Sequence, residues 1–402
     1  MTYQRIALEK LATLIKDGTH GTHKNVENGP YLLSAQNIEN GNIIINENER
    51  RISKEDFNII HRSYRLQNND ILITIVGSLG RCAILKNYNG DFTFQRSVAI
   101  IRFNKTRIIP KFAYYQIQTN TFQKELARRE SKGAQGGVYL GELAKIQLSV
   151  PDLETQQKII QILDTWNDTI ELLNKRILSE KEKFALFQHN LFMNSDYDKV
   201  PLRHLSTMHS GGTPNSKVAD FYGGDILWVS IADMTSVDDL YLNETKKHLT
   251  KKGFDSSSTI KIHPKGSVLY AMYASIGECV IAGRDMTSSQ AILGINCKTD
   301  KLYNKYLYYY LTSNKHKIKT LGQQGTQSNL NAKIVKEFEI PLPPLEMQAA
   351  ISKKLDAQVK LIQYLKDSKK YYLTQYKYLL NHLISGDFDL TNIELENGKE
   401  QQ

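Results

Sequence analysis

Two carboxylates and a lysine lie close together in the second half of the chain, and this combination can support metal-dependent hydrolysis. Asp239 is followed by Glu244 and Lys246. Acidic side chains beside a lysine are the groups with which a nuclease binds Mg²⁺ and activates water. The stretch is short, polar and typical of a loop, and the first half of the chain has no counterpart of it. A metal-dependent nuclease acting alone is therefore kept as an alternative function.

Other catalytic patterns are missing from the sequence. There is no Asn/Asp-Pro-Pro-aromatic motif for base methylation, and no glycine-rich loop follows a strand in the dinucleotide or P-loop pattern. His20 and His23 could ligate a metal ion, but no cysteine or further histidine lies near them, so contact with phosphate or solvent is the simpler interpretation. We expect a chain that has no catalytic residue, metal or cofactor of its own.

Polar side chains in glycine-containing loops are better candidates, and their chemistry suits nucleic acid. Arginine and lysine neutralise phosphates or bond guanine edges, whereas glutamine and asparagine can form two hydrogen bonds with adenine. Neighbouring glycines let the backbone approach a ligand closely. For each position, an ordinary solvated surface residue is the alternative. The candidate DNA-binding residues are Thr19, His20, Lys24, Arg81, Gln95, Arg96, Lys132, Gln135, Thr213, Asn215, Lys217, Ser275, Arg284, Gln290, Gln323, Gln327 and Asn329.

The composition agrees with a binding protein of more than one domain. A chain of 402 residues exceeds what one hydrophobic core usually organises. The net charge of +10 favours a polyanionic partner such as nucleic acid. No apolar run is long enough to span a membrane, and the N-terminus has no apolar signal core. The three cysteines lie far apart and form no disulfide framework. We therefore expect a cytoplasmic protein.

Two long amphipathic segments frame the chain. Residues 150–192 and 342–384 align without a gap, and both contain a Pro-x-Leu-Glu-x-Gln sequence, at Pro151 and at Pro343. Apolar residues spaced by threes and fours then predict one long helix in each segment. A narrow apolar stripe needs a partner, so we expect the helices to pair as an antiparallel coiled coil. The seam of the first helix is Ile159, Leu163, Trp166, Ile170, Leu173, Ile177, Phe184, Phe187 and Leu191, with one position missing near Glu180.

The segments before these helices also repeat each other. Strand-like runs at 71–76 and 98–103 precede a helical pattern at 110–123, and similar runs recur in the same order between 266 and 309. Gly18-Thr19 matches Gly212-Thr213, and Gln95 matches Gln290. The fold expected is α+β, with two mixed α/β domains related by a pseudo-two-fold internal repeat. The expected parts are a globular domain (1–150), a helix (151–199), a second domain (200–341), a second helix (342–386) and a flexible tail (387–402).

Taken together, these features resemble the specificity subunits of type I restriction–modification systems. The twofold plan, the Pro-x-Leu-Glu-x-Gln sequences and the heptads carry the resemblance, together with the segment Gly224–Ser230 and the loop 325–327. The resemblance covers essentially the whole chain. The first half departs from the pattern, because Asp152 replaces a proline and the loop 133–135 reads Gly-Ala-Gln.

This resemblance implies a non-catalytic subunit. Two target-recognition domains would read the halves of a bipartite, asymmetric site in double-stranded DNA, and the helices would set the spacer. Two methyltransferase subunits, which use AdoMet, would dock on the helices, and motor/nuclease subunits, which use ATP and Mg, would complete the complex. The residues expected to face outward towards the methyltransferase are Glu154, Gln156, Asp164, Glu346, Gln348 and Asp356. A helical adaptor without DNA contact remains a further alternative.

Overall fold

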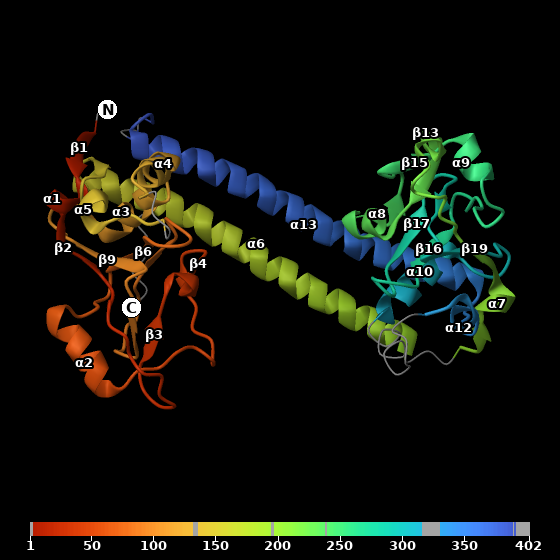
Figure 1. The fold of residues 1–402 in the computed structure, drawn as a ribbon, viewed down its shortest axis with the longest axis horizontal. Helices are drawn as coiled ribbons and strands as arrows, with labels where there is room; N and C mark the ends of the chain where they lie inside the picture. The colour runs from red at the N-terminus through yellow and green to blue at the C-terminus, as the bar shows by residue number, and fades with distance from the viewer. Residues whose placement is uncertain are drawn as a thin grey trace. The chain divides into compact units, whose positions relative to one another are not determined.

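The computed structural model describes residues 3–131, 136–193, 197–237, 239–315, 330–388 and 390. The chain forms two compact units, of which the first combines both ends of the sequence and the second is one continuous stretch. Unit 1 consists of Met1–Leu173 and Ser368–Gln402, and unit 2 consists of Asn174–Asp367. The boundary between the units crosses both long helices, α6 (Leu153–Met193) and α13 (Leu345–Ser385), which are the longest ribbons in Figure 1. No helix in the described ranges is long and apolar enough to cross a membrane.

Unit 1 is built on a four-stranded antiparallel sheet with the strand order β2-β9-β6-β7. Alternate side chains of these strands point to opposite faces. Ile71 and Ile73 join the core beneath α3 and the long helices, whereas Leu72 joins the core that contains α2 and the β3–β8 pair. The elements are β1 (Gln4–Ala7), α1 (Leu8–Leu11), β2 (Ala12–Asp17), β3 (Tyr31–Leu33), η1 (Ala35–Asn37), β4 (Ile38–Glu39), β5 (Asn42–Ile43), α2 (Lys54–Ser63), β6 (Ile71–Thr74), β7 (Cys82–Ile84), β8 (Phe92–Phe94), β9 (Val98–Phe103), α3 (Pro110–Ile117), α4 (Asn120–Arg128), α5 (Leu140–Ala144) and β10 (Gln147–Val150).

Unit 2 repeats this plan with one additional strand in its main sheet. Its main sheet has the order β12-β19-β16-β17-β14, and β15-β13-β18 form a second, smaller sheet. The elements are β11 (Lys199–Pro201), α7 (Leu202–Leu205), β12 (Ser206–Ser210), η2 (Ala219–Phe221), β13 (Tyr222–Val229), α8 (Ile231–Ser236), β14 (Tyr241–Leu242), β15 (Lys247–Leu249), α9 (Lys251–Asp255), β16 (Val268–Ala271), β17 (Cys279–Ala282), β18 (Thr287–Ser288), β19 (Ile292–Cys297), α10 (Asn304–Ser313), α12 (Ala332–Lys336) and β20 (Glu339–Pro341).

The long helices are antiparallel within each unit. In unit 1 the first part of α6 packs against the last part of α13, and the rings of Trp166 and Tyr372 lie 5.4 Å apart. In unit 2 the last part of α6 and the first part of α13 enter one core, which contains Phe192 and Leu355. The predicted mixed α/β fold with an internal repeat and a paired antiparallel coiled coil is confirmed.

Two details of the sequence-based interpretation are wrong. The helix expected over 110–123 is two helices, because α3 ends at Ile117 and Thr119 is the N-cap of α4, where its hydroxyl accepts a hydrogen bond from Phe122 N. The seam of α6 also differs near its end. Phe187 is exposed, and Glu180, which was taken as an interruption, is 3 % exposed and occupies a seam position itself.

Candidate nucleic-acid interface

One edge of the main sheet in unit 1 brings together the loops that carry most of the candidate DNA-binding residues of the first half of the chain. In this antiparallel sheet, β2 and β6 end at the same edge at which β9 and β7 begin. Arg96 N donates to Thr19 O at 3.0 Å, and Ile75 N donates to Ser97 O at 2.9 Å. These bonds join segments 18–24, 75–81 and 95–97, which we call loop edge 1.

Unit 2 has an equivalent edge. Gly211 N donates to Ile292 O at 3.0 Å, and Met272 N donates to Ala291 O at 2.9 Å. These contacts join segments 211–217, 272–278 and 289–291, which we call loop edge 2. Leu330 N donates to Met272 O at 3.2 Å.

The hydrogen bonds also correct the alignment of the two halves. Gly18 N and Gly211 N bond the first residues of β9 and β19, so Gly18 corresponds to Gly211 and not to Gly212. A β-carbon at either position would lie 2.0–2.1 Å from a carbonyl oxygen of the opposite segment, so both positions require glycine. Gln95 N and Ser289 N likewise make the same bond to the second sheet layer, to Leu33 O and Val229 O. Gln290 is thus the counterpart of Arg96.

The long side chains at the loop edges are available to a ligand. The side chains of Lys24, Arg81, Gln95, Arg96, Lys217 and Gln290 are exposed, and within the described ranges none of them has a hydrogen bond or ion pair. By contrast, Arg102, which is half-buried, is bound to Asp70 at 2.8 Å. Cationic and amide groups that are exposed at one edge and lack protein partners can bond phosphates and base edges.

The shorter side chains at the edges mostly shape the loops. Thr19 Oγ1 is 2.9 Å from His23 Nε2, and His20 Nε2 is 2.5 Å from Asp17 Oδ2. The two histidines therefore have different partners, and no group of three metal-ligating side chains occurs among the described residues. In loop edge 2, Thr213 and Asn215 are exposed, Ser275 is half-buried, and Asn215 Oδ1 accepts a hydrogen bond from Lys217 N at 3.0 Å.

Aromatic side chains hold loop edge 2 in place. Trp228 Nε1 donates to Gly212 O and Tyr222 OH donates to Pro214 O, each at 3.0 Å. Both aromatic residues belong to β13, and Trp228 also lies in the segment Gly224–Ser230 that carries the family resemblance. That segment is therefore a support for the loop, and the loop itself carries the groups that can contact a ligand.

Arg284 is separated from the other candidates. It follows β17, whose last residue lies at the sheet edge opposite the 272–278 hairpin, and its guanidinium is 2.7 Å from Glu244 Oε1. The structure therefore does not place Arg284 with the other candidates of loop edge 2. Both carboxylates of the nuclease alternative have partners within the protein. Glu244 is paired with Arg284, and Asp239 Oδ1 accepts a hydrogen bond from Leu240 N at 2.6 Å. Lys132, Gln135, Gln323, Gln327 and Asn329, and the loop 325–327, lie outside the described residues.

The glutamines assigned to partner binding instead attach each globular domain to its own helix. Gln156 and Gln348 are fully buried. Gln156 Oε1 accepts from Ile109 N at 2.8 Å, and its amide donates to Arg107 O and Pro151 O. Gln348 makes the same set of bonds, with Tyr303 N, Lys301 O and Pro343 O. The expectation that these two side chains face outward is wrong.

The two aspartates continue this attachment one to two turns further along each helix. Asp164 is bonded by Lys111 Nζ at 2.6 Å and by the hydroxyl of Tyr115. Asp356 is bonded by Lys305 Nζ at 2.5 Å and by Tyr309 OH at 2.7 Å. Burial and the bonded carboxylate raise the pKa of both tyrosines, which stay protonated as donors. The aspartates are thus bonded by their own domains, and their side chains stay partly exposed, Asp164 to 29 % and Asp356 to 23 %.

Glu154 and Glu346, by contrast, are exposed on the first turns of α6 and α13, and Glu154 lies 3.2 Å from Lys158. The repeated Lys-x-x-x-Tyr spacing at 111–115 and 305–309 was visible in the sequence and could have revealed the aspartate contacts.

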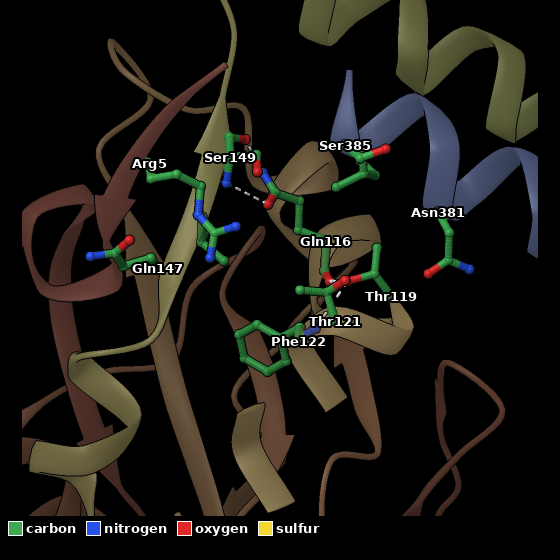
Figure 2. Close-up of a pocket in the computed structure, with 11 residues that line it drawn as sticks. Arg5, Gln116, Thr119, Thr121, Phe122, Gln147, Ser149, Asn381 and Ser385 are labelled. Atoms are coloured by element: carbon green, nitrogen blue, oxygen red, sulfur yellow. Dashed lines mark hydrogen bonds between the residues drawn. The ribbon is translucent and has the colours of Figure 1, made fainter. Parts of the chain in front are cut away.

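A small cavity of about 60 Å³ lies where α13 meets the domain of unit 1. Figure 2 shows that Arg5, Gln116 and Ser149 line one side and Asn381 and Ser385 the other. Gln116 is bonded through both ends of its amide to the backbone of Ser149. The polar groups of this cavity hold the helix to the domain, and the cavity belongs to the attachment and not to a loop edge.

A buried histidine pair supports loop edge 2 from inside the unit. His263 is fully buried, and its ring stacks on His209 at 4.6 Å. His263 Nε2 is 2.7 Å from Ser288 Oγ, and Ser288 O accepts from Gly212 N at 2.9 Å. Burial, and then the neighbouring His209, lower the pKa of His263 to about 3.

We predict that this pair makes unit 2 acid-sensitive. Below about pH 6.5 the unfolded chain protonates at His263 but the folded chain does not, until the pH approaches 3. Stability contributed by the neutral ring is complete above pH 6.5 and decreases on acidification by up to about 1.4 kcal/mol per pH unit. Urea unfolding at pH 8, 6 and 5, followed by Trp228 fluorescence in a Trp166→Phe background, measures this slope.

The matched variants for this measurement are His263→Gln, which removes the titration, and His189→Gln, which changes an exposed histidine of α6. We expect His263→Gln to reduce the number of protons taken up on unfolding by about one, so that the free energy of unfolding depends less on pH. His189→Gln should leave this pH dependence unchanged. An identical slope in His263→Gln and in the unchanged chain would contradict the prediction.

The fold and the two loop edges define a protein with duplicated binding halves joined by a helix pair. Comparison with known families makes this assignment specific. The chain belongs to the type I restriction modification DNA specificity domain family, whose model matches residues 24–181 and again residues 194–375.

Individual relatives agree with this membership. The EcoR124I/EcoR124II specificity subunit of Escherichia coli is 25 % identical over 288 residues, which cover 66 % of this chain and 68 % of that protein. A chain solved in work on assembly and conformational transition of a type I restriction–modification system has a TM-score of 0.67 at 16 % identity and covers 96 % of this chain. The HsdS subunit from Thermoanaerobacter tengcongensis has a TM-score of 0.54 at 15 % identity, with 96 % of this chain covered. These structures share the fold of this chain.

Proposed function

We propose that this chain is the DNA-recognition subunit of a type I restriction–modification complex, in which each loop edge reads one half of a bipartite, asymmetric site. The observation that supports this most is that each unit presents exposed arginine, lysine or glutamine side chains at the same sheet edge, and that these have no partner among the residues that the structure describes. The two edges have equivalent backbones and different side chains, as Arg96 and Gln290 illustrate. Equivalent scaffolds with different chemistry suit two unlike half-sites.

In this proposal the chain supplies recognition, and other subunits supply the reactions. Two methyltransferase subunits using AdoMet, and motor/nuclease subunits using ATP and Mg, would assemble on it. Exposed apolar side chains on the long helices, such as Leu172, Leu178 and Tyr364, offer surface for such partners. The family membership supports this role, as does the resemblance of the fold to subunits of such complexes.

Adenine methylation in a host tests the proposal directly. The chain would be co-expressed with methyltransferase subunits, and methylated adenines would be mapped across the genome with and without it. We expect a bipartite motif that disappears when the chain is deleted. If no methylated motif depends on the chain, the recognition role is rejected. DNA that stays unbound even with the partners present would favour the helical adaptor.

Single-edge variants are expected to alter one half of that motif. Replacing Gln95 and Arg96 by alanine removes two exposed groups from loop edge 1, and loss of each base contact costs about 1–3 kcal/mol. We expect at least about 30-fold weaker binding, since two contacts together cost about 2 kcal/mol or more, with relaxed preference at one half-site only. Gln290→Ala should relax the other half. Fluorescence anisotropy with the assembled complex and DNA randomised in one half-site measures both effects.

Arg284→Ala is the matched control, because this arginine is exposed but lies away from loop edge 2 and pairs with Glu244. We expect it to leave both half-sites unchanged. The nuclease alternative makes a different prediction, because purified chain would then cleave DNA with Mg²⁺ and lose this activity in Glu244→Ala. Loss of specificity in Arg284→Ala equal to that in the loop-edge variants would contradict the assignment of the loop edges.

A further inference from the structure

The two units differ at one equivalent layer of the helix pair. In unit 1 this layer is the aromatic contact between Trp166 and Tyr372. In the gapless alignment of the long helices, Trp166 corresponds to Gln358, and Tyr372 corresponds to Glu180. The antiparallel register that places Trp166 opposite Tyr372 therefore places Glu180 opposite Gln358 in unit 2. The same layer is aromatic in one unit and polar in the other.

The polar layer is buried and is costly to form. Glu180 is 3 % exposed, and Arg176 and Lys183 of its own helix lie 3.0 Å and 3.2 Å from its carboxylate. Gln358 Oε1 is buried without a hydrogen-bond partner in the described structure. Rotation of the amide by half a turn would place a donor at this position. Burying a carboxylate and an amide between helices stabilises less than an aromatic pair would, and this favours a role in pairing specificity.

The long helices could also pair with the same helix of a second copy of the chain, and the polar layer distinguishes these pairings from that of α6 with α13. If α6 paired with α6 of a second copy in the same register, Trp166 would face Glu180 twice. If α13 paired with α13 of a second copy, Gln358 would face Tyr372. Both arrangements place a polar group against an aromatic ring and lose the contact between Trp166 and Tyr372, so they are less stable than the pairing of α6 with α13. Only pairing of α6 with α13 places aromatic against aromatic and carboxylate against amide.

We propose that Glu180 and Gln358 form a pairing code that directs α6 to α13 and disfavours α6–α6 contact with a second copy of this chain. The ion pairs with Arg176 and Lys183 let α6 carry a buried carboxylate at this layer. The corresponding positions beside Tyr372 are Ser368 and Gln375, which carry no charge. Each assembled helix pair then combines the two different loop edges and excludes two copies of the same one. This inference concerns assembly of the chain and does not depend on DNA binding.

Mixed refolding of two tagged full-length chains tests the code. Copies with different affinity tags would be unfolded together in urea, refolded at equal concentration and captured through one tag, and the other tag would be quantified. In Glu180→Tyr/Gln358→Trp every pairing becomes aromatic, so we expect roughly tenfold more co-capture than for the unchanged chain, since a bias of 1.4 kcal/mol corresponds to a tenfold ratio. Equal co-capture by this folded variant and the unchanged chain would overturn the proposal.

The matched control is Glu180→Gln/Gln358→Glu, which exchanges the two polar groups and keeps a polar layer. We expect its co-capture to equal that of the unchanged chain, and co-capture as high as in the aromatic variant would also overturn the proposal. Circular dichroism verifies that each variant is helical. If the aromatic variant does not fold, Glu180→Leu/Gln358→Leu provides the same test with smaller side chains. If two copies exchange whole helices, α6 of one copy still pairs with α13 of the other. Such exchange contributes the same background of co-capture in every variant.

Discussion

Replacing Gln156 by leucine is expected to destabilise unit 1 by about 3 kcal/mol, and Gln348→Leu should do the same to unit 2. Each substitution keeps the side-chain size roughly constant but leaves a buried N–H, of Ile109 or Tyr303, and two carbonyls without their partner. An unsatisfied buried polar group costs about 1–3 kcal/mol. Urea unfolding followed by tryptophan fluorescence would assign the loss, because Trp166 lies in unit 1 and Trp228 in unit 2.

Two further variants separate hydrogen bonding from packing. Gln161→Leu changes an exposed glutamine on the same helix and should shift stability by no more than about 0.5 kcal/mol. Gln156→Glu keeps an acceptor for Ile109 N but replaces the amide donor, so a carboxylate would face two carbonyl oxygens. We expect it to destabilise unit 1 at pH 7 and to do so less at acidic pH, where the introduced group is protonated. Stability unchanged in Gln156→Leu would show that the attachment rests on the aspartates and apolar contacts alone.

The parts of the fold that follow a simple period were predictable from the sequence. The strand expected over 98–103 is β9 (Val98–Phe103). Both long helices begin two residues after the first proline of each Pro-x-Leu-Glu-x-Gln sequence, Pro151 and Pro343. These elements were recognisable because β9 is buried on both faces, which gives a continuous apolar run, and because the long helices bury one apolar stripe. Periodicity was less successful where a polar group occupies a buried position, as Glu180 does in the seam of α6. An ion pair with neighbouring residues offsets that burial, and no hydrophobic pattern reports it.

The candidate site was only partly predictable for the same reason. Loop residues such as Gln95 and Arg96 were found because their chemistry is suited to DNA and because they adjoin a recognisable strand. The alignment of the loops was wrong by one residue, since backbone hydrogen bonds decide which glycine closes the turn and both Gly211 and Gly212 fit the pattern. Gln156 was expected to face outward but is buried, and Asp164 is bonded by its own domain. A polar residue on an amphipathic helix is usually solvated, and only the contacts of α3 show that these two face their own domain.

Removing one heptad from both long helices is expected to shorten the spacer of the recognised DNA by about three base pairs. Deleting residues 170–176 and 362–368 removes segments that lie opposite each other in the antiparallel register. It shortens the pair by about 10 Å at 1.5 Å per residue, which corresponds to about three base pairs at 3.4 Å each. Methylation mapping should show the same two half-sites around a shorter spacer and loss of methylation at the original motif. Deleting the heptad from α6 alone shifts every later residue out of register and should abolish methylation altogether. An unchanged spacer with the double deletion would mean that the helices join the loop edges without setting their separation, while recognition of the half-sites by the loop edges would stand.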